Sequence, residues 1–168
     1  MLSFLMLIKK LIKFLNSNET VENIAFSLTI ALMMSLIPYN WVFHPIAFLI
    51  LIAFNGNLFI FLFMTPILNW ITPIIYTELH RLGTFILTNQ SMTSTFESIS
   101  NIPILIYTNW NNTVSMGGYV SVLIGSYPIY IFYKVAIKKY REILLPKIKK
   151  SKLIHLLKIP SLISIFKR

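Results

Sequence analysis

The sequence predicts an all-α, multi-pass membrane protein, and composition and charge pattern are the two observations that predict it. Of its 168 residues, 56% are hydrophobic and only 12% are charged, and the mean hydropathy is +0.72. A typical soluble domain is about 45–50% apolar and about 25% charged. Halving the charge removes the polar surface that keeps a soluble fold in water, so we expect one compact unit in a membrane.

Charge is also unevenly distributed along the chain. Between residues 23 and 133 the charged residues are Glu78, Arg81 and Glu97. Apart from Arg81 and three lysines near the N-terminus, every basic residue lies from Lys134 onward, and the formal net charge is +10. These basic residues flank apolar segments and do not cover a soluble fold. They therefore indicate cytoplasmic flanks and do not indicate a nucleic-acid partner.

This pattern divides the chain into three parts. Residues 1–18 form an amphipathic segment whose lysines cluster on one side, as in a helix that lies on a membrane surface. Residues 19–137 form the transmembrane domain, and residues 138–168 form a basic amphipathic cytoplasmic tail. In the tail, lysines lie beside large apolar residues, and we expect them to contact anionic lipid headgroups. These lysines are Lys147, Lys149, Lys150, Lys152 and Lys158.

Within the transmembrane domain, apolar helices are expected at residues 23–37, 45–54, 58–77 and 113–137. The first of these ends before Pro38 and covers only about 22 Å, and the second covers about 15 Å. Since a span needs about 30 Å of hydrocarbon, these two are expected to form a re-entrant helical hairpin or two short spans. The third and fourth segments are each long enough to cross.

The stretch between the two longer spans is mixed in character. Residues 79–87 are moderately amphipathic, residues 88–100 are polar and expected to be a loop, and residues 102–107 are a short apolar patch. Basic residues stay on the cytoplasmic side and flank both ends of the chain. Both termini are therefore expected in the cytoplasm, with an even number of crossings and the mixed stretch on the opposite side.

A polar stripe in the third segment is the first candidate site. Its members share one face of a helix, and the other faces are mostly Phe, Ile, Leu and Met. They are Thr65, Asn69, Thr72 and Tyr76. A lipid-facing Asn is unfavourable, so this stripe is expected to point into the protein or into a wet cavity. Two interpretations stay open: its hydrogen bonds join helices, or its polar groups line a ligand site.

The motif Asn55-Gly56-Asn57 interrupts the apolar sequence between the second and third segments. Asn and Gly both tolerate positive φ, so the motif predicts a tight reversal of the chain. The alternative interpretation is that Asn55 and Asn57 meet Asn69 around the headgroup of a substrate.

Small residues recur at four-residue intervals in two of the segments. They are Ser27, Ala31 and Ser35 in the first segment and Gly117, Ser121 and Gly125 in the fourth. Such stripes allow helix backbones to approach closely in lipid. Either the first segment packs on the fourth, or one of the stripes forms a homodimer.

No pattern typical of a catalytic or metal site is present in the sequence. There is no Cys, which excludes disulfides, thiol nucleophiles and cysteine metal sites. There is also no paired-carboxylate site, metal cluster, phosphate loop, Ser-His-Asp order or dinucleotide fingerprint. The sequence therefore predicts no catalytic residue, metal or cofactor, and it favours a non-enzymatic role.

Four motifs follow one another in a recognisable order: "ENIAFSLTIALMMSLIP" from Glu22, "AFLILIAFNGN" from Ala47, "ELHRLGTFIL" from Glu78 and "GSYP" at residues 125–128. Their order resembles a family of small bacterial integral membrane proteins of unknown function, whose domain is sometimes fused to glycosyltransferases. The resemblance implies the same membrane architecture and brings no activity with it.

Together these observations favour an integral membrane protein of the bacterial cytoplasmic membrane that organises or handles lipid or lipid-linked envelope intermediates. The alternative function is a small transporter or channel with a polar intramembrane site, suggested by the short helices and the polar stripe. Membrane lipids with anionic headgroups are the expected partners. A protein partner and a homo-oligomer both stay open.

Overall fold

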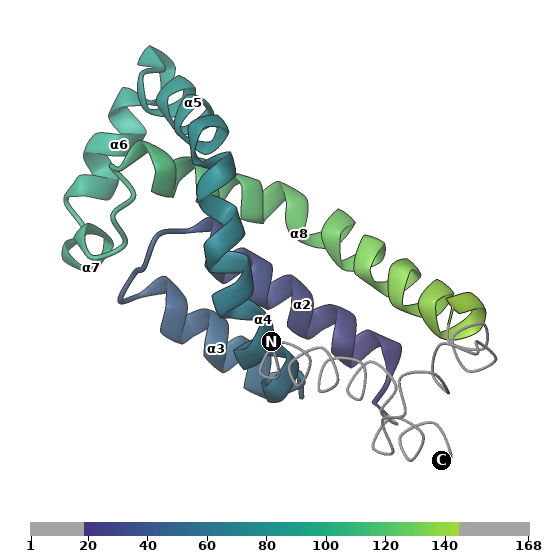
Figure 1. The fold of residues 1–168 in the computed structure, drawn as a ribbon. Helices are drawn as coiled ribbons and strands as arrows, with labels where there is room; N and C mark the ends of the chain where they lie inside the picture. The colour runs from purple at the N-terminus through teal and green to yellow at the C-terminus, as the bar shows by residue number, and fades with distance from the viewer. Residues whose placement is uncertain (1–18, 145–168) are drawn as a thin grey trace.

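The computed structural model describes residues 19–144, and the fold within this range is built from helices (Figure 1). The α-helices are α2 (Val21–Leu36), α3 (Phe43–Ala53), α4 (Leu58–Ile71), α5 (Tyr76–Leu87), α6 (Thr93–Ser100), α7 (Pro103–Ile106) and α8 (Thr113–Lys139). The 3-10 turns are η1 (Thr72–Ile75) and η2 (Gln90–Met92), and the π-helical turn is η3 (Tyr140–Leu144). The segment predicted at residues 1–18 and the five tail lysines expected to contact lipid headgroups, from Lys147 to Lys158, lie outside the described residues.

Polar side chains fix where three of these helices begin. Thr20 caps α2, Asn57 caps α4 and Asn112 caps α8. Each side-chain oxygen accepts a hydrogen bond from the backbone N–H three residues further along the chain. These N–H groups have no partner inside the helix, so a capping side chain stabilises the start of the helix.

Helix α3 begins at Phe43, before the predicted start at residue 45. The buried Asn40 explains the earlier start, because its Oδ1 accepts hydrogen bonds from Val42 N (2.9 Å) and Phe43 N (2.8 Å). Its Nδ2 donates to the carbonyl oxygen of Tyr107 (3.1 Å). The Asn40 side chain therefore ties the α2–α3 connection to the segment that precedes α8.

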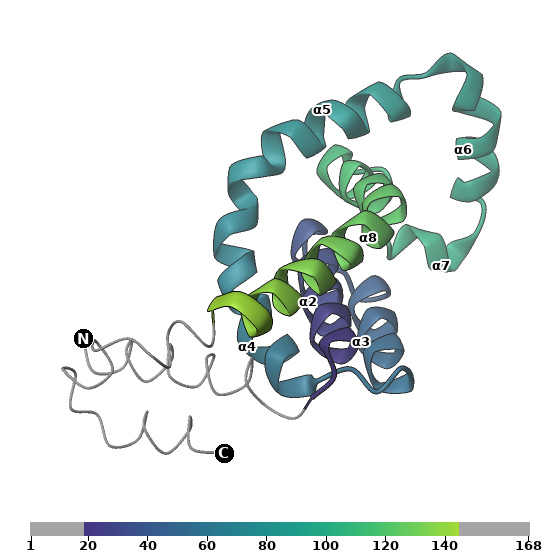
Figure 2. The same cartoon turned by 90° about the vertical axis from the view of Figure 1, so that its right-hand side faces the viewer.

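The span predicted at residues 58–77 continues further than expected. Helices α4 and α5 and the turn η1 form one helical stretch, Leu58–Leu87, which bends between α4 and α5 (Figure 2). Pro73 lies in this turn, and a proline removes a backbone donor and bends a helix. Beyond the bend, α5 packs along α8.

The prediction of a loop at residues 88–100 is wrong in part, because helix α6 lies within this range. The hydroxyl groups of Ser98 and Ser100 donate to carbonyl oxygens one turn earlier, at 2.9 and 2.8 Å. The rings of Phe96 and Trp110 stack with their centroids 5.5 Å apart. This contact with a distant residue supports a short polar helix that periodicity does not reveal.

Helix α2 lies at the centre of the fold. It packs on α3, α4 and α8, and Figure 1 shows it between α3 and α8. Ile24, Ala25 and Ala31 are fully buried. A helix of 16 residues can therefore be almost wholly enclosed by its longer neighbours.

The two ends of the described chain lie side by side. Lys134 Nζ on α8 lies 2.9 Å from Glu22 Oε1 at the start of α2. Arg141 Nη1 donates to the carbonyl oxygen of Glu19 at 2.9 Å. The chain therefore enters and leaves the helical bundle at the same end.

Within the described residues, two helical stretches are long and apolar enough to cross a membrane, Leu58–Leu87 and Thr113–Ile143. Of the 18 most apolar consecutive residues in each stretch, only 17% are buried in Leu58–Leu87 and only 6% in Thr113–Ile143. Large apolar side chains such as Trp70, Ile74 and Leu123 point outward. These helices therefore differ from the core helix of a soluble protein, which is mostly buried.

Candidate functional site

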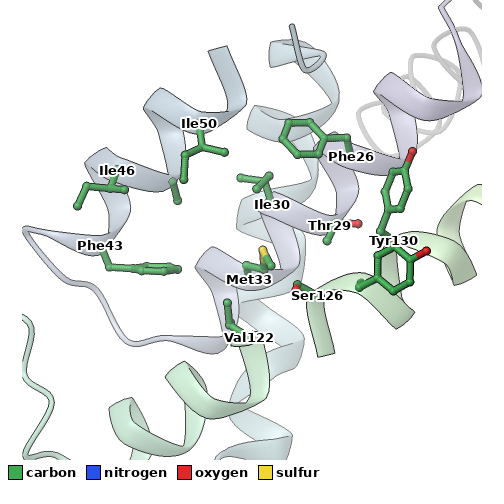
Figure 3. A pocket seen from close by; sticks show the side chains of 12 residues that line it. Phe26, Thr29, Ile30, Met33, Phe43, Ile46, Ile50, Val122, Ser126 and Tyr130 are labelled. Carbon is green, nitrogen blue, oxygen red and sulfur yellow. The ribbon is translucent and has the colours of Figure 1, made fainter. Parts of the chain in front are cut away.

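An apolar groove opens between α2, α3 and α8 (Figure 3). Its volume is about 440 Å³, within the range of about 300–1,000 Å³ that is usual for ligand sites. The lining residues are Phe26, Thr29, Ile30 and Met33 on α2, Phe43, Ile46, Ala47 and Ile50 on α3, and Val122, Ser126, Tyr127 and Tyr130 on α8.

The groove exists because α2 holds α3 and α8 apart. Both helices pack along α2, and each presents residues three or four positions apart to the space between them. Figure 3 shows Ile46 and Ile50 on α3 lying across from Ile30 on α2, with Val122 and Ser126 on α8 below them. Along α8 the lining covers about 12 Å, at about 1.5 Å per residue.

One end of the groove is bounded by aromatic rings. The rings of Phe43 on α3 and Tyr119 on α8 meet edge to face, with their centroids 5.6 Å apart. The Tyr119 hydroxyl donates to the carbonyl oxygen of Thr108 at 2.7 Å, which fixes the position of its ring. This end lies beside the segment that Asn40 ties to the α2–α3 connection.

The other end of the groove leads to charged groups. Phe26 on α2 and Tyr130 on α8 are its last lining residues. One helical turn beyond each of them stand Glu22 and Lys134, whose side chains form the 2.9 Å ion pair. The groove is therefore apolar along its length and ionic just past one end.

The lining offers few polar groups. Thr29 Oγ1 donates to the carbonyl oxygen of Ala25 at 2.8 Å, so its hydrogen is already used within α2. The remaining polar atoms of the lining are the hydroxyls of Ser126, Tyr127 and Tyr130, and the lining contains no Asp, Glu, Lys, Arg or His. A surface of this composition fits a hydrocarbon chain.

The predicted polar stripe does not line this groove. Thr72 is buried, Thr65 and Tyr76 are half-buried, and Asn69 is exposed. Thr65 Oγ1 donates to the carbonyl oxygen of Phe61 within its own helix at 2.7 Å. The Thr72 hydroxyl is buried without a hydrogen-bond partner. Because the stripe does not converge on one cavity, it gives no support to the transporter or channel alternative.

Asn55-Gly56-Asn57 makes the predicted reversal, between α3 and α4. Asn55 adopts φ 52°, and the backbone N–H groups of Asn55 and Gly56 donate to Ile52 O (3.0 Å) and Leu51 O (2.8 Å). This is the Schellman arrangement of a helix end. Gly56 is needed for space, because an added Cβ would overlap the Leu51 side chain. The geometry of the turn thus accounts for Asn55 and Gly56.

The alternative interpretation of this motif does not agree with the structure. Asn57 and Asn69 lie near opposite ends of α4, about 18 Å apart along its axis. Asn57 caps α4, and its backbone N–H donates to Ser27 Oγ at 2.6 Å. The structure therefore does not bring Asn55, Asn57 and Asn69 together around one ligand.

The stripe of small residues on α2 faces α4. Ser27, Ala31 and Ser35 are all buried. Ser27 accepts the hydrogen bond from Asn57 N, and Ser35 Oγ lies 3.4 Å from the carbonyl oxygen of Thr65. Small side chains here allow α4 to approach the α2 backbone closely.

The small residues of α8 lie against other neighbours. An added Cβ at Gly117 would overlap the carbonyl oxygen of Leu79 on α5. Ser121 is half-buried, and a Cβ at Gly125 would meet only Ile129 Cδ1, at 3.3 Å. Helices α2 and α8 do pack on each other, but not through the two predicted stripes. The sequence shows which residues are small and does not show which helix covers them.

Sequence reasoning missed the residues that line the groove. They are ordinary apolar and aromatic residues at helical spacing, which in a sequence is the pattern of a buried core. Only the separation of α3 from α8 turns these faces into a groove.

Within the described residues, the fold and the groove together define a helical bundle with apolar outer surfaces and an apolar groove. Residues 6–143 match the bacterial family described as "Uncharacterized protein conserved in bacteria (DUF2062)", and the chain belongs to this family. No curated protein and no solved structure matches the chain. The family agrees with the resemblance to bacterial proteins of unknown function that the sequence motifs indicate.

Proposed function

We propose that this protein is a multi-pass protein of the bacterial cytoplasmic membrane whose groove holds a hydrocarbon chain of a lipid or lipid-linked envelope intermediate. The observation that carries the proposal is the apolar lining of the groove between α2, α3 and α8. The role is to hold or organise the lipid, because the lining has no acid or base for chemistry on it.

The outer surface of the helices supports placement in a membrane. Trp70 is 89% exposed, and Leu123 is 81% exposed. Soluble monomers rarely expose large contiguous apolar patches, and such surfaces mark contacts with membranes or partners. The two stretches that are long enough to cross carry these side chains, so lipid is the simplest environment for them.

The two ends of the bundle carry the residues expected at two membrane surfaces. Exposed Tyr39, Trp41 and Tyr107 gather at one end, which we call the aromatic end. Lys134, Lys138 and Arg141 lie at the other end, which we call the basic end. Trp and Tyr are enriched at membrane interfaces, and Lys and Arg at the cytoplasmic side. We therefore assign the basic end to the cytoplasm.

The length of α8 agrees with this placement. From Thr113 near the aromatic end to Lys134 at the basic end, α8 covers about 32 Å, close to the hydrocarbon thickness of about 30 Å. Both ends of the described chain lie at the basic end, as expected if both termini are cytoplasmic. The α2–α3 connection is bonded to Tyr107 at the aromatic end, which favours two short spans over a re-entrant hairpin.

Reporter fusions test this topology in cells. A reporter after Arg168 should be active on the cytoplasmic side, and a reporter inserted within residues 88–100 should be active on the opposite side. Reporters that both detect the same compartment would show that the chain does not cross the membrane once between the two positions, and the placement would be wrong.

Photo-crosslinking tests the groove in the full-length protein. A phospholipid with a photoreactive group near the end of its acyl chain should label residues of the groove, identified by peptide mass spectrometry. Ser126→Phe places an aromatic ring in the groove, which should block the hydrocarbon chain and abolish this labelling. Leu123→Phe places the same aromatic ring on the exposed face of the same helix and should leave the labelling intact. Equal labelling of both variants would refute binding in the groove.

A further inference from the structure

The apolar groove cannot by itself select one lipid from the bilayer. A hydrocarbon chain of a lipid that moves from the bilayer into the groove exchanges one apolar environment for another. Its binding therefore gains little hydrophobic free energy. Selectivity must then come from groups that contact the lipid headgroup. The ionic end of the groove is where such groups stand.

The Glu22–Lys134 ion pair continues the two helix faces that line the groove. Phe26 and Glu22 are four residues apart on α2, and Tyr130 and Lys134 are four residues apart on α8. Residues at this spacing lie on the same face of a helix, about 6 Å apart along its axis. The headgroup of a lipid whose hydrocarbon chain lies in the groove would therefore lie next to the Glu22–Lys134 ion pair.

The two lysines at this end are accessible to a ligand. The Lys134 side chain is 43% exposed, and exposed ion pairs such as that with Glu22 contribute little to stability. Lys138, one turn further along α8, is 67% exposed and lies 4.0 Å from Glu142. Arg141 is already engaged with the Glu19 carbonyl oxygen. Both ammonium groups can therefore exchange a carboxylate for a ligand oxygen.

We infer that Lys134 and Lys138 bind the phosphate of a lipid whose hydrocarbon chain lies in the groove. This inference rests on the proposed function. Two ammonium groups one turn apart suit a phosphate, which offers several acceptor oxygens and a negative charge. Glu22 competes with the phosphate for Lys134, so the pair opens when the lipid binds.

Binding of two lipids to the detergent-solubilised full-length protein tests the inference. The probes are phosphatidic acid and diacylglycerol with identical acyl chains, titrated by native mass spectrometry. The unmodified protein should bind phosphatidic acid at least about tenfold more tightly. Lys134→Gln should weaken phosphatidic acid binding about fivefold, as expected for one lost cation near an anionic group, and should leave diacylglycerol binding unchanged. Lys138→Gln should act in the same direction.

Two further variants separate a binding role from a structural one. Glu22→Gln frees Lys134 and should strengthen phosphatidic acid binding, whereas loss of a merely structural ion pair would weaken binding in both Glu22→Gln and Lys134→Gln. Lys139→Gln makes the same change of charge at an exposed neighbouring position and should have no effect. Equal losses in Lys134→Gln and Lys139→Gln would overturn the inference in favour of nonspecific attraction.

The remaining outcomes distinguish the inference from the proposed function. If both lipids bind equally and Ser126→Phe abolishes both, the groove holds a chain and the phosphate site is wrong. If Ser126→Phe changes neither lipid, the proposed function itself fails. Displacement of phosphatidic acid by equimolar inorganic phosphate would show that the site takes free phosphate, against the inference.

Discussion

The contact between α5 and α8 gives a quantitative prediction for Gly117→Ala. An added Cβ at Gly117 would overlap the carbonyl oxygen of Leu79, and one at Gly83 would overlap that of Thr113 and lie 2.7 Å from Thr113 C. These neighbours are backbone atoms, which cannot rotate away. The helices would have to separate by roughly 1.5 Å to reach normal contact distances of about 3.5 Å.

The expected cost follows from this overlap. Forcing extra volume into a packed interface costs about 1–3 kcal/mol. The matched control is Gly125→Ala on the same helix, because its Cβ would meet only the mobile end of Ile129 at 3.3 Å. Replacing a helical Gly by Ala in free space stabilises by about 0.5–1 kcal/mol. The two substitutions should therefore change the free energy of unfolding in opposite directions.

Thermal unfolding of the purified full-length protein in detergent measures this difference. The two variants should differ by roughly 1.5–4 kcal/mol, and Gly117→Ala should have a Tm at least about 3 °C below that of Gly125→Ala. Gly83→Ala should behave as Gly117→Ala does. Equal Tm values for the two α8 variants would refute the close packing of α5 on α8.

Two further predictions concern polar residues, with the same assay. Asn55→Gly should be neutral because Gly accepts φ 52°, whereas Asn55→Val should lower stability by about 1–2 kcal/mol because a branched residue resists positive φ; equal stability of the two variants would exclude this conformation. Asn40→Leu should cost about 2–4 kcal/mol, since it leaves the N–H groups of Val42 and Phe43 and the Tyr107 carbonyl unpaired. Asn69→Leu, at an exposed position, should cost less than about 1 kcal/mol, and a loss as large as that of Asn40→Leu would contradict the observed exposure of Asn69.

Local signals in the sequence predicted most of the helices. The turn at residues 55–57 acts within a few residues, so its chemistry is readable without the fold. The role of Asn40 was not predicted, because its partner at Tyr107 is far along the chain. Helix α6 was missed for the same reason, since its aromatic contact is with the distant Trp110.

The sequence by itself determined that the chain is helical and apolar, with basic residues at its ends. Composition and the spacing of apolar residues can be read along the chain without knowing which segments meet in space. Only the tertiary structure decided which faces meet. It placed the small residues of α2 against α4, and it brought Gly83 against Gly117. It also separated α3 from α8, so that faces with the pattern of a core line a groove, and it placed the Glu22–Lys134 ion pair one helical turn beyond one end of that groove. Such contacts depend on how whole helices are arranged in space, and no local pattern encodes that arrangement.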